Sequence, residues 1–197
     1  MAKANARREA ILNAALDEFS ARGFAAARLD DVARRAGVAK GTIYLHFADK
    51  EALFQELVRF QLIPIVGVFE AALDSDIPLR ALIDQAIEIF ATQIYGTHRK
   101  LVIRLIISEG PRFPVLAEFY YREVLARILG ALRARFVRAL DRGEIPDDTL
   151  IRFPQLIGAA SVVAIIWHSL FDHYEPLDVR AMLRAYFDRL FAGGVTA

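Results

Sequence analysis

Cysteine is absent from the 197-residue sequence, which excludes disulfide bonds, thiolate metal sites and cysteine nucleophiles. The 7 prolines and 11 glycines are too few for a fibrous or disordered chain. An excess of one charge is also lacking, because 25 Lys and Arg residues stand against 24 Asp and Glu residues. Any interaction with nucleic acid must therefore be argued from where the basic residues lie, not from the net charge of +1.

Catalytic motifs are missing as well. The sequence has no glycine-rich phosphate loop, no nucleophile elbow and no HExxH pair. His168 and Asp172 lie one helical turn apart, with His173 and Glu175 nearby, and this spacing can supply metal ligands. A histidine at an interface beside a helix-ending aspartate explains the same residues. We therefore expect a protein that is not an enzyme and that holds no cofactor and no metal.

One uncharged stretch, residues 153–171, approaches the roughly 20 residues that span a bilayer. It contains Pro154, Gln155 and His168, which favour a buried or interface helix over a membrane span. Residues 1–8 lack the apolar core of a signal peptide. We expect no membrane association and a cytoplasmic location, with which the lack of cysteine agrees.

The sequence does contain long segments whose apolar residues recur every three or four positions, which predicts an all-α fold. Gly23 is placed to end the first helix in a left-handed conformation, Asp49 to cap a helix from about Lys50, and Pro64 to kink or end that helix. Later helices are expected to run from Pro78 to about 96, then over 98–109, 114–141, 153–171 and 177–191, the last ending at Gly193-Gly194. The predicted inner face of the first helix consists of Ile11, Leu12, Ala14, Ala15, Leu16 and Phe19.

Residues 28–54 are the most informative segment. Two short helices joined by a turn at Gly37 have the layout of a helix-turn-helix, whose second helix lies in the major groove of DNA. Apolar residues such as Val32, Ile43 and Phe47 can lock the two helices together. The opposite face of the second helix offers side chains that can bond phosphates or base edges, and Gly41 lets the backbone approach the duplex. The predicted DNA-binding residues are Arg28, Lys40, Gly41, Thr42, Tyr44, His46 and Lys50.

The run from Asp31 to Phe47, followed by Lys50-Glu51-Ala52-Leu53, resembles the signature of the TetR family of bacterial transcriptional regulators. The resemblance implies a helix-turn-helix domain over 1–48 and a helical domain over 49–197 for effector binding and dimerisation. It places Lys40, Gly41, Thr42, Tyr44 and His46 on the recognition helix and Lys50 on a phosphate-contacting lysine. Ala27-Arg28 departs from the Thr or Ser usual there, so the charge of Arg28 is expected to replace a hydroxyl contact.

The resemblance further implies a homodimer that binds a palindromic operator in double-stranded DNA and is released as a repressor by a small molecule. We expect an apolar or aromatic effector, although core packing by itself explains the aromatic and apolar candidates, since every helical bundle needs such residues. Residues 104–120 more weakly resemble the AefR-like subgroup. The candidate ligand-binding residues are Phe60, Phe69, Phe90, Tyr95, Arg104, Glu109, Phe113, Phe119 and Trp167. A different DNA-binding role on the same fold, in chromosome organisation or cell division, stays open as the alternative.

Overall fold

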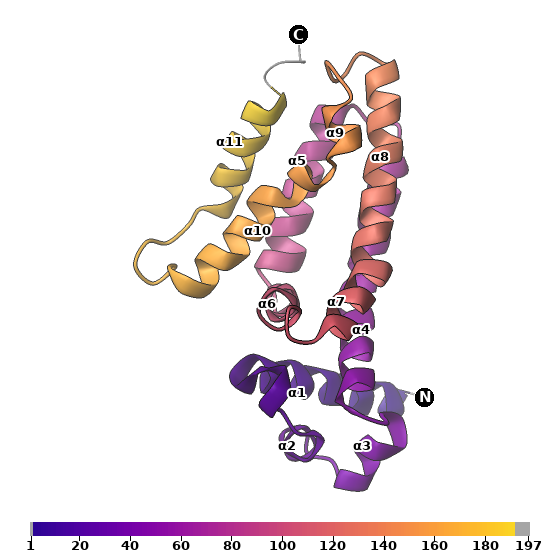
Figure 1. Ribbon diagram of the computed structural model, residues 1–197, viewed down its shortest axis with the longest axis vertical. Coiled ribbons are helices and arrows are strands. Elements are labelled where there is room, and N and C mark those ends of the chain that lie inside the picture. Colours follow the sequence, from indigo (N-terminus) through magenta and orange to yellow (C-terminus); the bar gives the residue numbers. More distant parts are fainter. Residues whose placement is uncertain (1, 192–197) are drawn as a thin grey trace. The chain divides into compact units, whose positions relative to one another are not determined.

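The computed structural model describes residues 2–191, with side chains from residue 5, and every regular element in that range is helical. The all-α prediction is therefore confirmed. The elements, labelled in Figure 1, are α1 (Ala2–Ala26), α2 (Leu29–Arg35), α3 (Lys40–His46), α4 (Lys50–Asp74), α5 (Leu79–Ile89), the π-helical η1 (Phe90–Tyr95), α6 (Arg99–Glu109), α7 (Pro114–Tyr120), the π-helical η2 (Tyr121–Leu125), α8 (Ala126–Asp141), α9 (Thr149–Arg152), α10 (Gln155–Leu170) and α11 (Val179–Phe191).

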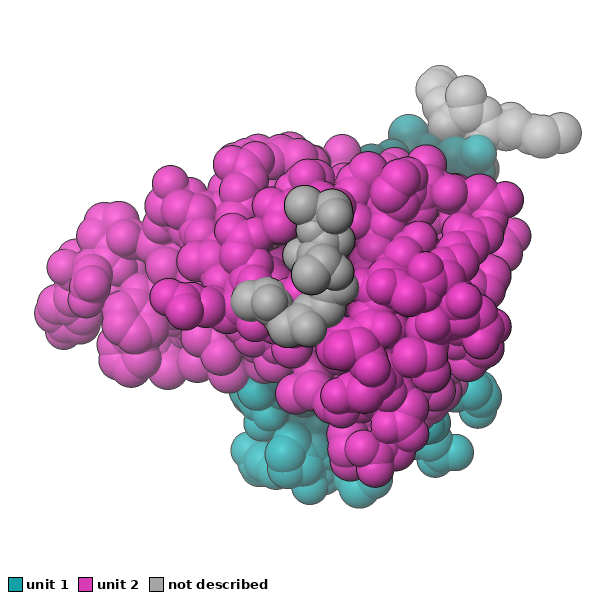
Figure 2. Space-filling view, turned by 90° about the horizontal axis from the view of Figure 1, so that it is seen from above, with its two compact units in different colours: residues 1–64, 101–123 teal, residues 65–100, 124–197 magenta. Residues whose placement is uncertain are grey.

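The chain forms two compact units, coloured separately in Figure 2. Unit 1 comprises residues 1–64 and 101–123, and unit 2 comprises residues 65–100 and 124–197. Unit 1 thus joins the three N-terminal helices to the first part of α4 and to most of α6 and all of α7. The predicted functional division at residue 48 concerns which residues read DNA, and it stays a prediction.

The core of unit 1 is built on the apolar face predicted for α1, all of whose members are buried. Phe19 packs against Phe24 and Phe54 with ring centroids 5.3 and 6.2 Å apart, which ties α1 to the start of α4. Gly23 has φ 73° and ψ 164°, as expected for a glycine at a helix break. Backbone helix hydrogen bonding resumes after it as far as Ala26.

Helix α4 begins at Lys50, as the sequence predicts from Asp49 as its N-cap. The backbone N–H of Ala52 donates to Asp49 Oδ1 at 2.7 Å, which is the expected capping bond. The sequence predicts that Pro64 kinks or ends this helix, and the second of these expectations is wrong. Pro64 does not end the helix, which continues to Asp74. A proline removes one backbone donor, and here the buried neighbours Leu62, Ile65 and Val66 hold the helical path on both sides.

In unit 2, α11 packs against α5 and α10, and α8 packs against α9. Two arginines on α8 and Arg142, which follows it, bond the end of α4 and the turn after it. Arg138 donates to the Leu73 carbonyl at 2.7 Å, Arg142 to Asp76 at 2.8 Å and Arg135 to the Ile77 carbonyl at 3.2 Å. Arg135, fully buried, donates to Glu144 at 2.8 Å. Because buried charges are stable only when paired, this contact fixes the loop after α8.

Two further expectations concern the uncharged stretch 153–171 and the end of the last helix. The uncharged stretch 153–171 is interrupted at Phe153-Pro154 and contains the 16-residue α10. By length and composition α4 can cross a membrane, a test that buried helices of other proteins also pass, and 44% of its apolar window is buried. The final helix ends at Phe191 in the described chain. The predicted Gly193-Gly194 terminus lies outside the described residues.

Candidate nucleic-acid interface

The turn between α2 and α3 is built around Gly37, which adopts φ 66°. The backbone N–H of Val38 donates to the Ala33 carbonyl at 3.0 Å, closing the end of α2. Val32, Ala33 and Ile43 are buried between the helices, so the spacing of apolar residues in the sequence has produced the predicted helix-turn-helix. The consequence is that the other face of α3 is turned to solvent.

Most of the candidate DNA-binding side chains on α3 are exposed. Lys40, Gly41, Tyr44 and His46 are exposed and Thr42 is half-buried. Apart from its chain neighbours and the backbone of α3 itself, no atom lies within 4 Å of the position that a Cβ of Gly41 would occupy, so the backbone faces open space there. The site prediction omitted Leu45, which is 84% exposed. Its position in the middle of this face is the signal that identifies it, because apolar side chains contact the thymine methyl group in the major groove.

Lys40 and Tyr44 share a partner that the sequence analysis did not predict. Lys40 Nζ lies 2.6 Å from Asp30 Oδ2, and the Tyr44 hydroxyl donates to Asp30 Oδ1 at 3.3 Å. The hydrogen bond from Lys40 lowers the pKa of Asp30, and the same bond raises the pKa of Lys40. A carboxylate of α2 therefore contacts two side chains of the exposed face of α3.

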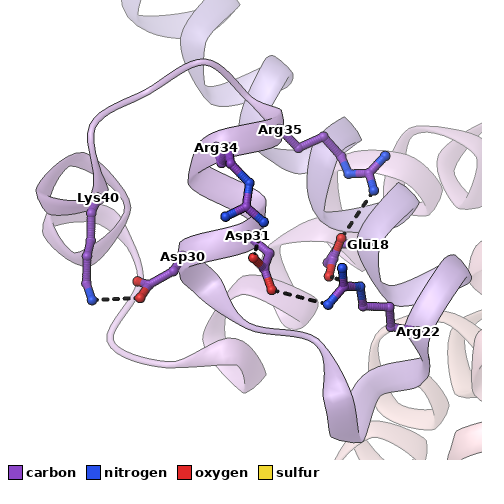
Figure 3. A network of polar contacts seen from close by, with 7 residues as sticks. All are labelled: Glu18, Arg22, Asp30, Asp31, Arg34, Arg35 and Lys40. Atoms are coloured by element: carbon purple, nitrogen blue, oxygen red, sulfur yellow. Dashed lines mark hydrogen bonds and ion pairs between the residues drawn. The ribbon is translucent and has the colours of Figure 1, made fainter.

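A second charge network joins α1 to α2 (Figure 3). The buried carboxylate of Glu18 lies 3.1 Å from Arg22 Nε and accepts a hydrogen bond from Arg35 at 3.2 Å. Arg22 also lies 3.5 Å from Asp31, which pairs with Arg34. Because Glu18 is buried and ionised groups need partners in the interior, the network fixes how α2 sits on α1.

Arg28 and Lys50, the two predicted phosphate contacts, differ in the hydrogen bonds that they make within the protein. Arg28 is exposed at the N-terminus of α2, in extended conformation and without a side-chain capping bond. Lys50 donates to the carbonyl oxygens of Phe24 and Ala25 at 2.9 and 2.7 Å, and its ammonium lies 4.9 Å from the centre of the Phe24 ring. Lys50 thus holds the end of α1, and only its remaining N–H is available to a phosphate.

The candidate ligand-binding residues fall into both units. Phe60, Arg104, Glu109, Phe113 and Phe119 belong to unit 1, and Phe69, Phe90, Tyr95 and Trp167 to unit 2. The structure does not gather them into one cluster within a unit.

Three of the unit 1 candidates contact the C-terminal part of α1. Arg104 donates to the Ser20 carbonyl at 3.1 Å, and Phe113 packs edge-on against Phe24 with centroids 4.9 Å apart. Glu109 lies against Gly23. A fourth unit 1 candidate, Phe119, is buried. The guanidinium carbon of Arg59 lies 4.8 Å from the centre of the Phe119 ring. Each of these contacts is accounted for by packing within unit 1.

In unit 2, Tyr95 is the centre of a mixed aromatic and polar group. Its ring lies 5.2 Å from the His168 ring, and Lys100 Nζ lies 5.2 Å from its centre. His168 Nδ1 is 3.1 Å from Asp172 Oδ2. Burial raises the pKa of Tyr95 and lowers that of Lys100. Within the described residues no three His, Cys, Asp or Glu side chains come together as a metal site, so this pair gains no third ligand there.

Residues 11–57 match the model of the family described as bacterial regulatory proteins, tetR family. This range contains α2, the Gly37 turn and α3. The HTH-type transcriptional repressor BepR of Brucella suis biovar 1 (strain 1330) is 34% identical over 159 residues, which cover 75% of this chain and 72% of the relative. The similarity therefore extends well beyond the helix-turn-helix.

Solved structures share the fold over nearly the whole chain. FadR of Bacillus subtilis, in complex with stearoyl-CoA, gives a TM-score of 0.71 at 19% identity, covering 94% of this chain and 98% of that one. A complex of triclosan with SmeT, a repressor from Stenotrophomonas maltophilia, gives 0.75 at 20% identity, covering 97% and 92%. None of these similarities tests the AefR-like subgroup, which stays a prediction. The chain belongs to the tetR family of bacterial regulatory proteins and is a DNA-binding transcriptional regulator, not an enzyme.

Proposed function

We propose that this regulator is a cytoplasmic repressor that binds a palindromic operator as a homodimer and leaves it when a small apolar or aromatic effector binds. The observation that carries the DNA-binding part is the exposed face of α3, where Lys40, Thr42, Tyr44 and His46 surround the bare backbone of Gly41. Hydroxyl, imidazole and ammonium groups on a short helix are the groups that contact bases and phosphates in the major groove.

Arg28 and Lys50 complete the proposed surface as phosphate contacts. Arg28 is exposed at the start of α2, and Lys50 at the start of α4 retains one donor beyond its two carbonyl partners. Leu45 joins the proposed set because it is the most exposed apolar side chain of α3. Arg28 directly precedes α2, Leu45 lies on α3 and Lys50 begins α4, so the proposed contacts to phosphates and bases come from three segments of unit 1.

The proposed dimer is supported by α10. Five large apolar side chains on this helix are exposed in the single chain: Leu156, Val162, Val163, Ile166 and Leu170. A surface of this kind is normally covered by another protein surface, and a twofold partner supplies the same helix. Two reading helices about 34–36 Å apart would then meet successive major grooves of a palindrome.

The effector part of the proposal rests on unit 2. The Phe90, Tyr95 and Trp167 side chains supply aromatic surface there, with Phe90 and Tyr95 centroids 6.3 Å apart. Structurally similar regulators bind triclosan and stearoyl-CoA, both of which carry large apolar parts. Helix α4 is continuous through Pro64 from unit 1 into unit 2, and a shift of this helix is the proposed route by which an effector lowers operator affinity.

Selection of duplexes from a random DNA pool by the purified protein, at about 150 mM salt, tests the proposal. A palindrome with half-sites about one helical turn apart is the expected result. Enrichment of a single half-site would overturn the dimer, and many scattered genomic sites would favour a chromosome-organising role. Thermal-shift screening tests the effector: we expect stabilisation by apolar or aromatic compounds, and stabilisation by strongly charged compounds alone would contradict it.

A further inference from the structure

Asp30, on α2, is an acidic side chain that contacts α3, and it binds two of the residues proposed to read DNA. Its Oδ2 lies 2.6 Å from Lys40 Nζ and its Oδ1 accepts the Tyr44 hydroxyl proton at 3.3 Å. Lys40 also lies 5.8 Å from the centre of the Tyr44 ring. The three side chains therefore form one cluster, which we call the Asp30 cluster, on the solvent side of α2 and α3.

The direction of the Tyr44 hydrogen bond decides what this tyrosine can recognise. A phenol has one proton to donate, and here that proton is directed to Asp30. The phenol oxygen is then left as an acceptor. DNA phosphates offer no hydrogen-bond donor, so they cannot satisfy it. In the major groove the available donors are the exocyclic amino groups, N6 of adenine and N4 of cytosine.

Lys40 is affected in a different way. Its charge is balanced by Asp30, so the pair contributes almost no net charge at the DNA surface. A phosphate that approaches Lys40 also approaches the carboxylate and is repelled by it. The electrostatic, sequence-independent part of DNA binding is thereby weakened at this position.

From these two observations we propose that Asp30 is a specificity-determining residue, which makes Tyr44 a hydrogen-bond acceptor for an exocyclic base amino group and neutralises Lys40 toward phosphates. This inference rests on the proposed function, because it requires α3 to lie in the major groove. Asp30 acts through Tyr44 and Lys40 and is a positioning residue, with no contact of its own to DNA required.

The test uses the full-length protein and two duplexes, the operator selected from a random pool and an unrelated sequence of equal length. Asp30→Asn keeps the shape of the side chain but removes its charge, and its amide can donate as well as accept. We expect it to bind the unrelated duplex about tenfold more tightly at 0.1 M salt, with the slope of log K against log salt steeper by about 0.9. Tyr44→Phe should leave that slope unchanged.

Base recognition is read from the operator itself. At the position where Tyr44 sets the preference, replacing adenine by purine, or cytosine by 2-pyrimidinone, removes only the amino group. The wild type should lose about fivefold in affinity on this change, whereas Tyr44→Phe and Asp30→Asn should each lose nothing further. The double variant should match Tyr44→Phe for this readout, because Asp30 acts on the amino group only through the Tyr44 oxygen.

Asp17→Asn is the matched control. Asp17 is an exposed carboxylate on α1 in the same unit, and the substitution removes the same charge. It should keep the amino-group preference and show a smaller change of slope. Thermal unfolding of each variant shows that the fold is intact. An Asp30→Asn protein with unchanged slope and unchanged base preference would overturn the inference alone, whereas a wild type that binds neither duplex would overturn the proposed function with it.

Discussion

The carboxylate of Glu109 lies against the backbone of Gly23, with Oε1 2.9 Å from the point that a Cβ at Gly23 would occupy. These residues come from α6 and α1, two helices of unit 1 that are far apart in the sequence. Gly23 also has φ 73° with ψ 164°, a region of backbone conformation that is almost restricted to glycine. Both the close approach and the dihedral angles therefore require the missing side chain.

Gly23→Ala is expected to lower the free energy of unfolding by about 1–3 kcal/mol, because alanine is strained at these dihedral angles. Chemical denaturation measures the change. Gly130→Ala is the matched control: Gly130 lies inside α8 with open space around it, so alanine there should stabilise the protein by about 0.5–1 kcal/mol. If adding Glu109→Ala restored Gly23→Ala to full stability, the cost would come from the contact and not from the backbone.

Local patterns in the sequence were sufficient to predict the elements that surround this contact. The three- and four-residue spacing from Ile11 to Phe19 gave the buried face of α1, and Asp49 gave the start of α4. Of the two outcomes predicted for Pro64, a kink or a helix end, the end is wrong, because the buried residues on either side outweigh the single backbone bond that a proline removes. Short-range rules do not include that packing.

Contacts between distant residues were beyond prediction. Arg104 stood out as a charge in an apolar run, but its partner is the Ser20 carbonyl, 84 residues away. The pairing of Asp30 with Lys40 and Tyr44 depends on the crossing of α2 and α3, which the turn at Gly37 sets. A sequence pattern shows that Lys40 and Tyr44 share a face, but not that a carboxylate from another helix is placed between them.

Removing the charge of Lys50 should change both stability and DNA binding. Lys50→Gln loses two charge-assisted hydrogen bonds to the end of α1, and we expect a loss of about 1 kcal/mol in the free energy of unfolding at this half-buried site. If Lys50 also holds a phosphate, the slope of log K against log salt becomes flatter by about 0.9 for every duplex. Lys50→Arg keeps the charge and should keep the slope. If Lys50→Gln lowered stability but left the slope of log K against log salt unchanged, Lys50 would stabilise the end of α1 without contacting a phosphate.

The proposed dimer predicts that a charge in the middle of the α10 surface separates the subunits. Val163 is 52% exposed in the single chain, and a glutamate there would be buried without a partner in the dimer. We expect Val163→Glu to raise the dimer dissociation constant at least a hundredfold, corresponding to about 3 kcal/mol, as measured by sedimentation velocity. Val137→Glu introduces the same charge at a valine on α8 that is 45% exposed and should leave the dimer intact. Equal effects of the two changes on the dissociation constant would contradict the assignment of the dimer interface to α10.

Tyr120, at the end of α7, predicts a loss of stability in alkaline solution. Burial raises its pKa from 10 to about 12, because the phenolate would lose its hydration in the interior. The folded state therefore keeps the proton at a pH where the unfolded state releases it, so the contribution is present below pH 10 and is lost as the pH rises toward 12. Between pH 9 and 11 this group alone should lower the free energy of unfolding by about 1 kcal/mol.

Tyr120→Phe removes the ionisable hydroxyl, so the variant should lose about 1 kcal/mol less than the wild type between pH 9 and 11 when denaturation is followed at both values. Tyr121→Phe is the matched control, because Tyr121 is the next residue in the chain and is 57% exposed. It should retain the wild-type alkaline loss. Ultraviolet absorbance of the phenolate gives an independent readout: the wild type and Tyr120→Phe should ionise alike up to about pH 11 and differ by one tyrosine only above it. A difference that is already complete at pH 10 would show that Tyr120 reaches solvent.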